Sequence, residues 1–165
     1  MNIELFLTQF ITFLMLISIA SCTDVNPESP TYNLALVRNL HEAQRDHHFN
    51  KDSVAFAEQM SKDFVSVNGG FITTPSKEES ITRYNRYFSS VEFEKWDDVS
   101  EPVFRFSDDS TMAYTIVDKI VALTYPDSMG NTIRDETHFA WTTVYTMHDG
   151  EWKIDCVTST RQIAE

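Results

Sequence analysis

Two side chains in the carboxy-terminal half of the chain have the chemistry of a general acid and a general base. Asp118 lies within the apolar run 113–123, and His138 begins a later strand-like run. An imidazole exchanges protons near neutral pH, and a nearby carboxylate can orient it or share its proton. If the strand register brings them together, Asp118 and His138 would form a catalytic acid–base couple.

The alternation around Asp118 leaves the direction of its side chain open. Asp118 shares a face with Tyr114 and Ile116, whereas Lys119 points to the opposite side. A charged side chain on an apolar face is costly unless it is paired. One of the two charged residues must therefore point inward, and Asp118 lies either in a pocket or on the wetted face. His138 can likewise be an ordinary strand-end histidine.

Aromatic side chains are the second candidate source of function. They make up 13% of the chain, with 12 Phe, 6 Tyr and 3 Trp. This content exceeds that of a disordered segment and suits a large apolar interior or a pocket. The residues expected to line a ligand pocket are His41, Asn68, Tyr84, Trp96, Tyr114 and Trp141. Aromatic stripes also build plain hydrophobic cores, and this alternative stays open.

The amino-terminal residues predict export and lipid attachment. Residues 5–20 are almost continuously apolar and lead into Ser21 and Cys22, which is typical of a lipoprotein signal peptide ending in a lipobox. We therefore expect a signal peptide over 1–21 and a diacylglycerol thioether on Cys22. Because the usual basic start is missing, a retained single-span anchor and an interfacial helix are the alternatives.

The segment 22–30 contains two prolines among polar residues, which is typical of a tether. It would hold the domain 31–165 in solution next to the membrane. The expected location is therefore the extracytoplasmic side of a bacterial cell membrane, to which the lipid on Cys22 anchors the protein.

Charge and cysteine content exclude several function classes. The formal net charge is −12, so the phosphate backbone of a nucleic acid would be repelled, and no nucleic-acid partner is expected. Anionic lipids are repelled as well, so the lipid on Cys22 must hold the protein at the membrane. Once Cys22 is acylated, Cys156 has no cysteine partner within the chain. It is expected to be a buried, small apolar residue.

The sequence predicts neither a metal site nor a cofactor. His41, His47 and His48 lie in one helical segment, but no two of them are four residues apart, as a pair of zinc ligands on one helix face would be. The chain has only 4 glycines and no Gly-rich phosphate-binding loop.

Three helices are expected in the first half of the domain. Helical periodicity predicts helices over 32–49 and 52–60, the first with Leu36, Leu40, Ala43 and His47 on one face. A third helix begins with a capping box between Ser76 and Glu79 and runs to about residue 88. A short strand over 63–67 and a turn over 68–70 separate the second helix from the third.

From residue 91 the hydrophobic period changes to two, which predicts strands. They are expected at 91–96, 102–106, 112–125, 138–147 and 152–160. Asp149-Gly150 between the last two is a strong hairpin signature. Helices followed by hairpin-linked strands predict an α+β fold, in which a curved antiparallel sheet is covered on one face by about three helices.

Several of these motifs occur together in one known group of proteins. They are the strand 63–67 with its glycine turn, the helix start 76–79, and the Asp-Gly-x-Trp-x-Ile hairpin 149–154 followed by Ser159. In this order they resemble the nuclear transport factor two-like superfamily, in particular its SnoaL-like bacterial branch, over about residues 32–160. The resemblance implies a cone, with a curved antiparallel sheet wrapped on three helices, a pocket at the open end and a frequent dimer contact through the sheet.

The resemblance also bears on the chemistry. In the ketosteroid isomerase branch a catalytic Asp precedes the turn glycine, whereas Asn68 stands at the matching place here. An amide cannot take up a proton as a carboxylate can. The tyrosine that this branch uses on its first helix has no match either, and the pocket-side polar residues would be His41 or Gln44. Isomerase chemistry of that kind is therefore not expected.

Three functions from different classes stay open, because the fold alone does not decide among them. We favour a membrane-tethered lipoprotein whose cone binds a small, mostly apolar ligand without chemistry. The second is an isomerase, hydratase or dehydratase that acts on a small carbonyl compound through Asp118, His138 and a tyrosine hydroxyl. The third is a catalytically empty adaptor or a homodimerising domain, in which sheet-face residues such as Tyr145 would set the oligomeric state.

Overall fold

The computed structural model describes residues 29–162. Its helices are α2 (Pro30–Phe49), α3 (Ser53–Glu58) and α4 (Lys77–Ser90). Its strands are β1 (Met60–Asn68), β2 (Phe71–Thr73), β3 (Glu92–Asp98), β4 (Val103–Phe106), β5 (Met112–Pro126), β6 (Thr132–His148) and β7 (Glu151–Arg161). The predicted signal peptide and Cys22 lie outside the described residues. In the described part of the chain, no helix combines the length and apolar character needed to cross a membrane.

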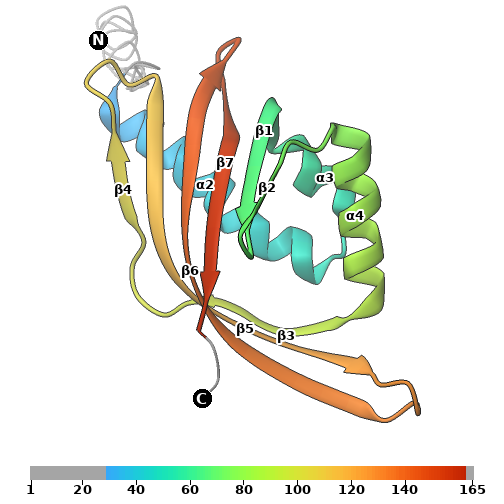
Figure 1. The fold of residues 1–165 in the computed structure, drawn as a ribbon. Helices are drawn as coiled ribbons and strands as arrows, with labels where there is room; N and C mark the ends of the chain where they lie inside the picture. Colours follow the sequence, from blue (N-terminus) through green and yellow to red (C-terminus); the bar gives the residue numbers. More distant parts are fainter. Residues whose placement is uncertain (1–28, 163–165) are drawn as a thin grey trace, which may run out of the picture.

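The strands form one curved sheet in the order β2-β1-β7-β6-β5-β3, with β4 also paired to β5. All neighbours are antiparallel except β1 and β7, which run parallel. Figure 1 shows α2 crossing behind β4 to β7, while the far half of the β5–β6 hairpin bends beneath α3 and α4. The predicted α+β architecture, a curved and largely antiparallel sheet wrapped on amino-terminal helices, is confirmed.

The predicted helix starts are confirmed by their caps. Asp52 accepts a hydrogen bond from the Ala55 amide at 2.9 Å and so caps α3. Ser76 and Glu79 make both bonds of the capping box at the start of α4. Each bond satisfies an amide that the first helical turn leaves without an intrahelical acceptor.

The β5–β6 hairpin is longer than the sequence predicts. β6 begins at Thr132 rather than at residue 138, and the segment 132–137 pairs with 121–126 of β5. Its charged run does not alternate with apolar residues, so the period-two pattern is missing there. Ion pairs occur there instead, since Arg134 contacts Glu94 of β3 and also Glu136 of its own strand, each at 2.7 Å.

The buried face of α2 is polar, which differs from the predicted face. Leu36, Leu40, Ala43 and His47 are only half-buried. The fully buried positions are one residue away, and they are Asn33, Val37, His41, Gln44 and His48. Polar side chains are tolerated there because several have partners inside the fold, as where the indole Nε1–H of Trp152 donates to Asn33 at 3.1 Å.

The hydrophobic core occupies one end of the cone. Val37 of α2 packs there against Phe64, Tyr145, Trp152 and Ile154 of the sheet. Trp152, from the predicted hairpin motif, is therefore a core residue. The opposite half of the concave face is covered by α3 and α4 (Figure 1). A cavity lined by aromatic side chains lies between these helices and the sheet.

Candidate functional site

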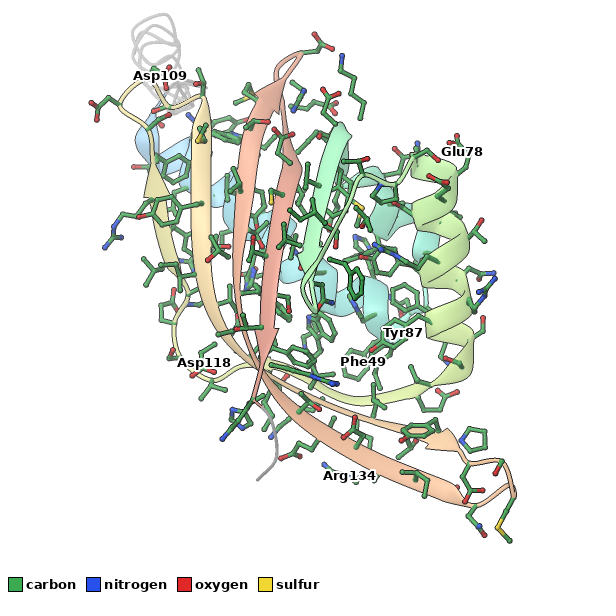
Figure 2. All side chains as sticks on the ribbon, viewed as in Figure 1. Phe49, Glu78, Tyr87, Asp109, Asp118 and Arg134 are labelled. Carbon is green, nitrogen blue, oxygen red and sulfur yellow. The ribbon has the colours of Figure 1, made fainter. Side chains whose placement is uncertain are left out.

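A cavity of about 550 Å³ lies between the concave face of the sheet and the three helices. This volume lies within the range of pockets that hold a drug-sized ligand. Figure 2 shows Tyr87 of α4 directed toward the space that the bent sheet encloses. The deep part of the cavity is bounded by His48 and Gln44 of α2, and its walls come from α3, α4, β1, β3, β5, β6 and β7.

Aromatic side chains form the walls. Tyr84 of α4 contacts Phe56 of α3 edge to face, with ring centroids 4.5 Å apart. Trp96 of β3 and Trp141 of β6 are neighbours with centroids 5.6 Å apart, and Phe139 extends this wall along β6. Such walls present flat apolar surface at little cost in side-chain entropy, because each ring has few rotatable bonds.

His48 is held as a neutral imidazole in the deep part of the cavity. Its ring stacks on Trp96 with centroids 3.5 Å apart, and the edges of Phe56 and Phe88 close around it. Burial lowers the pKa of His48 to about 3, although the hydrogen bond to the Gln44 backbone raises it slightly. Because a carbonyl only accepts, His48 Nδ1–H donates to the Gln44 carbonyl at 2.6 Å. The other ring nitrogen, Nε2, therefore keeps its lone pair and is a hydrogen-bond acceptor.

A polar cluster lies next to His48, between α2 and the sheet. It consists of the Gln44 amide, the Tyr145 hydroxyl and the hydroxyls of Thr115 and Thr143, and all four residues are buried. Gln44 and Thr143 also line the cavity. Burial raises the pKa of Tyr145 to about 12, so its hydroxyl remains protonated at physiological pH.

The rim of the cavity carries the exposed polar residues. Asn68 at the end of β1, Asp135 of β6 and Arg161 of β7 all line the cavity and are exposed. Asn68 follows the predicted strand directly and precedes the Gly69-Gly70 turn, in which both glycines have positive φ. Charge is therefore found at the opening, whereas the deep part has neutral polar groups and aromatic rings.

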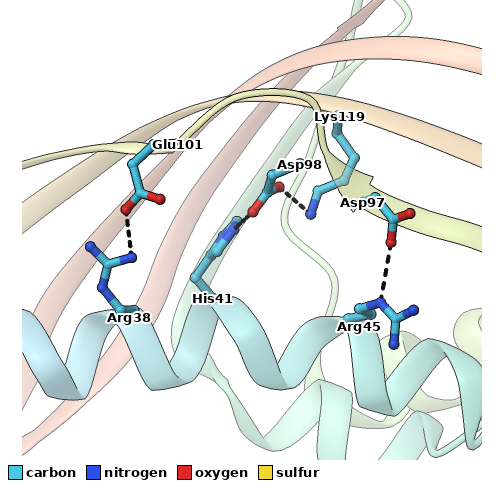
Figure 3. A network of polar contacts seen from close by, with 7 residues as sticks. All are labelled: Arg38, His41, Arg45, Asp97, Asp98, Glu101 and Lys119. Atoms are coloured by element: carbon cyan, nitrogen blue, oxygen red, sulfur yellow. Dashed lines mark hydrogen bonds and ion pairs between the residues drawn. The ribbon is translucent and has the colours of Figure 1, made fainter.

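An ion network lies behind the Trp96 wall (Figure 3), in which His41 and Lys119 are buried and Asp98 is partly exposed. His41 Nε2–H donates to Asp98 at 2.8 Å, and the Lys119 ammonium contacts the other carboxylate oxygen. Burial acts to raise the pKa of Asp98, but the hydrogen bonds from His41 and Lys119 outweigh it and hold the pKa below its usual value. Lys119 also lies 6.0 Å from the Trp96 ring centroid and 5.8 Å from that of Trp141.

The predicted catalytic pair is not in the cavity. Asp118 pairs with Ala140 and His138 with Ile120, so the two side chains are diagonal neighbours on one face of the sheet. That face is the outer one, where both residues are exposed, and Asp118 lies away from the helices in Figure 2. The expectation of a pocket-facing Asp118 is thus corrected, because Lys119 takes the inward direction and Asp98 compensates its charge.

Four of the six predicted ligand-binding residues line the cavity. They are Asn68, Tyr84, Trp96 and Trp141. His41 is buried in the ion network instead, and Tyr114 is 41% exposed on the outer face. Tyr114 faces outward for the same reason as Asp118, since both alternate with the inward-facing Lys119.

Sequence reasoning missed the deep cavity residue His48 and the buried Tyr145 behind the cavity wall, and it gave Gln44 only a passing mention. His48 and Gln44 are four residues apart on α2 and therefore share a face, which is the one available hint. Cys156 is half-buried rather than buried. Between residues 29 and 162, no three His, Cys, Asp or Glu side chains gather in a way that could hold a metal ion.

Neither a family model nor a curated protein matches this sequence. Solved structures match in fold. A protein described as a calcium/calmodulin-dependent kinase II association domain, from Exiguobacterium sibiricum, has a TM-score of 0.66 and 14% identity, covering 83% of this chain and 98% of that chain. A nuclear transport factor two-like protein from Cytophaga hutchinsonii has a TM-score of 0.62 and 16% identity, covering 78% and 98%.

One of the structures that match in fold is described as an enzyme. A protein described as a scytalone dehydratase, from Novosphingobium aromaticivorans, has a TM-score of 0.64 and 10% identity, covering 79% of this chain and 84% of that chain. At such identities the likeness is one of fold. The cone expected from the sequence motifs is therefore confirmed as architecture, and the chemistry of the site must be argued from its own residues.

Proposed function

We propose that this protein is a lipid-anchored, extracytoplasmic binding protein whose cone holds a small, mostly apolar molecule without transforming it. The observation that carries the proposal is the cavity of about 550 Å³, with aromatic walls and a deep part in which none of the lining residues among 29–162 is charged. Transfer of apolar surface from water into such a site drives binding. A charged group at that depth would lose its hydration without gaining a counter-charge.

An enzyme that acts on a carbonyl compound is the second candidate, and the dehydratase among the structural neighbours favours it. With Asp118 and His138 on the outer face, the bases that line the cavity are His48 in its deep part and the Asp135 carboxylate at its exposed rim. A general base works best when its pKa lies near the working pH. Since burial brings the pKa of His48 down to about 3, this imidazole is a weak base and a good hydrogen-bond acceptor, which supports binding over catalysis.

The pocket proposal predicts that filling the cavity abolishes binding. Leu123→Trp places an indole in the space, because Leu123 of β5 lines the cavity and is only half-buried. We expect the affinity for 2-acetylnaphthalene, used as an apolar aromatic probe, to fall by roughly tenfold or more, measured by equilibrium dialysis. Ile116→Trp is the matched control, since Ile116 lies on the same strand, is exposed and faces away from the cavity.

Equal loss of affinity in both variants would point to a general disturbance of β5 and count against the pocket. Native mass spectrometry of the protein purified from its own source complements this experiment. A small-molecule adduct that is lost on denaturation, and that is missing from the Leu123→Trp variant, would identify the class of the natural ligand.

The anchoring proposal rests on the lipobox-like residues that end at Cys22. We expect Cys22→Ser to abolish the incorporation of labelled palmitate and to move the protein out of the membrane fraction. Cys156→Ser is the control, because it removes the other cysteine while leaving the acylation site. Labelling that survives in Cys22→Ser would contradict lipidation at this residue.

The outer face of the sheet is the surface available for a partner or for a second copy of the chain. Apolar side chains of β4 and β5 are exposed there, including Tyr114 at 41% and Ile116 at 50%. Tyr145, which the sequence pattern placed on such a face, is instead completely buried on the inner side. Substitutions that test homodimerisation therefore belong at Tyr114 or Ile116.

A further inference from the structure

Three of the four residues of the polar cluster next to His48 have a buried side-chain atom without a hydrogen-bond partner. The Tyr145 hydroxyl, the Gln44 Nε2 amide and the Thr115 hydroxyl have no partner of normal geometry among residues 29–162. Gln44 is 7% exposed, while Tyr145 and Thr115 are fully buried. Thr115, Thr143 and Gln44 nevertheless lie close enough to the Tyr145 hydroxyl to offset part of the effect of burial on its pKa.

This arrangement is costly for the fold. Buried polar groups in proteins are almost always hydrogen-bonded, and an unpaired one loses its interaction with water without compensation. Phenylalanine in place of Tyr145, or methionine in place of Gln44, would occupy nearly the same volume without that cost. Several unpaired polar atoms gathered at one point therefore indicate a function outside the stability of the fold.

The cluster is connected to the ligand cavity. Gln44 and Thr143 line the cavity directly, and Tyr145 and Thr115 lie immediately behind them. The Gln44 backbone carbonyl also fixes His48, so the cluster and the stacked imidazole bound the same deep end of the cavity. A ligand that fills the aromatic part would meet Gln44 and Thr143 at this end, and a shift of the Gln44 side chain would open the way to the Tyr145 hydroxyl behind it.

The cluster favours an acceptor oxygen without charge. The Tyr145 hydroxyl is protonated, and an amide nitrogen can only donate, so two donors are directed to one region. Asp98 acts to raise the pKa of Tyr145, and its ion-pair partner Lys119 acts to lower the pKa of His48, so these two opposite charges largely offset each other near the cluster. His48 itself is neutral, so an anionic ligand would meet no unpaired positive charge among the described residues at this end of the cavity.

We propose that the deep end of the cavity recognises an uncharged carbonyl oxygen, which accepts hydrogen bonds from Gln44 Nε2 and the Tyr145 hydroxyl. The ligand class is therefore a compact, mostly aromatic or alicyclic molecule that enters with its ketone, ester or amide oxygen first. This inference rests on the proposed binding function and specifies the chemistry of the ligand. A water molecule could satisfy the same atoms, and the test must separate the two.

The test compares two probes of nearly the same shape. 2-Acetylnaphthalene carries a carbonyl, and in 2-isopropenylnaphthalene a C=CH2 group takes the place of C=O. We expect the full-length protein to bind the ketone about tenfold more tightly in equilibrium dialysis, since two hydrogen bonds form to donors that otherwise stay unpaired. In Tyr145→Phe and in Gln44→Met this preference should fall to about threefold or less, with the affinity for the hydrocarbon unchanged.

Tyr114→Phe is the matched control, because it removes a phenol hydroxyl from the outer face of the sheet. It should keep the full preference for the ketone. Tyr145→Phe should also melt at a temperature no lower than that of the unchanged protein, which separates a lost ligand contact from a damaged core.

Equal binding of the two probes to the unchanged protein would overturn the inference while leaving the binding function intact, because a water molecule would then satisfy the cluster. Binding of neither probe would overturn both the inference and the proposed pocket. A preference that survives in Tyr145→Phe and Gln44→Met would place the carbonyl elsewhere and equally reject this assignment.

Discussion

Asp98→Ala is expected to lower the free energy of unfolding by about 3 kcal/mol, because it leaves the Lys119 ammonium buried without its counter-charge. The Lys119 side chain is 4% exposed, and Asp98 is its ion-pair partner in the network of Figure 3. His41 loses its carboxylate partner in the same substitution. Two inward-facing polar residues would thus be uncompensated at once.

Urea unfolding at neutral pH measures this effect, and Asp97→Ala is the matched control. Asp97 is the neighbouring residue and contacts Arg45 at 3.3 Å, but both side chains are substantially exposed, so we expect a loss below about 1 kcal/mol. The double variant Asp98→Ala with Lys119→Met should recover most of the stability, since no buried charge remains. A double variant as unstable as Asp98→Ala would show that lost packing, rather than the unpaired charge, is the cause.

The second large effect is a loss of stability in mild acid through His48. In the unfolded chain its pKa is near the ordinary value of 6.5, whereas burial lowers the pKa in the folded state to about 3. As the pH falls below 6.5, His48 becomes protonated in the unfolded state but stays neutral in the folded state. The equilibrium therefore shifts toward unfolding. The loss approaches about 5 kcal/mol only once the pH has fallen below the pKa of the folded state.

The clearest window is between about pH 7.5 and about pH 5.5, where His48 alone should lower the free energy of unfolding by about 1 kcal/mol. Carboxylates such as Asp98 and Asp155, whose pKa values are lowered, stay ionised in this range in the folded protein. Urea unfolding at the two pH values measures the loss. His48→Gln should reduce it, and His138→Gln, which removes an exposed histidine, controls for the simple loss of one imidazole.

If His48→Gln and the unchanged protein lose the same stability across this window, the imidazole is not the group responsible. NMR titration of the His48 ring in the folded protein gives an independent check. A ring that takes up its proton near pH 6.5 would contradict the burial that the aromatic contacts of Trp96, Phe56 and Phe88 impose.

The secondary structure was largely predictable because it depends on local rules. The caps at Asp52 and at Ser76 with Glu79 fix helix starts through hydrogen bonds only three residues apart in the chain. Period-two alternation predicts the strands wherever one face is buried. It failed over residues 132–137, where ion pairs within β6 and to β3 take the place of apolar contacts.

The choice of which face of β5 points inward shows why the site was only partly predictable. Alternation places Asp118 and Lys119 on opposite faces and cannot say which of them is inside. The answer depends on Asp98, which lies about 20 residues earlier in the chain. Its carboxylate compensates the positive charge of Lys119 once β3 pairs with β5. The assignment of Asp118 and Tyr114 to a pocket was wrong for this one reason. Trp96 and Trp141 were correctly placed at the cavity, because the burial of large aromatic side chains does not depend on which face of β5 points inward.

The sequence by itself determined an acidic α+β domain with a high aromatic content, its helix starts and most of its strands. All of these depend on composition or on contacts between close neighbours in the chain. Only the tertiary structure decided that α2 buries His48 and Gln44, that Tyr145 faces them from β6, and that the chemistry gathers at this end of the cavity. These groups lie far apart in the sequence, and their pKa values and hydrogen bonding depend on burial, which only the folded chain creates.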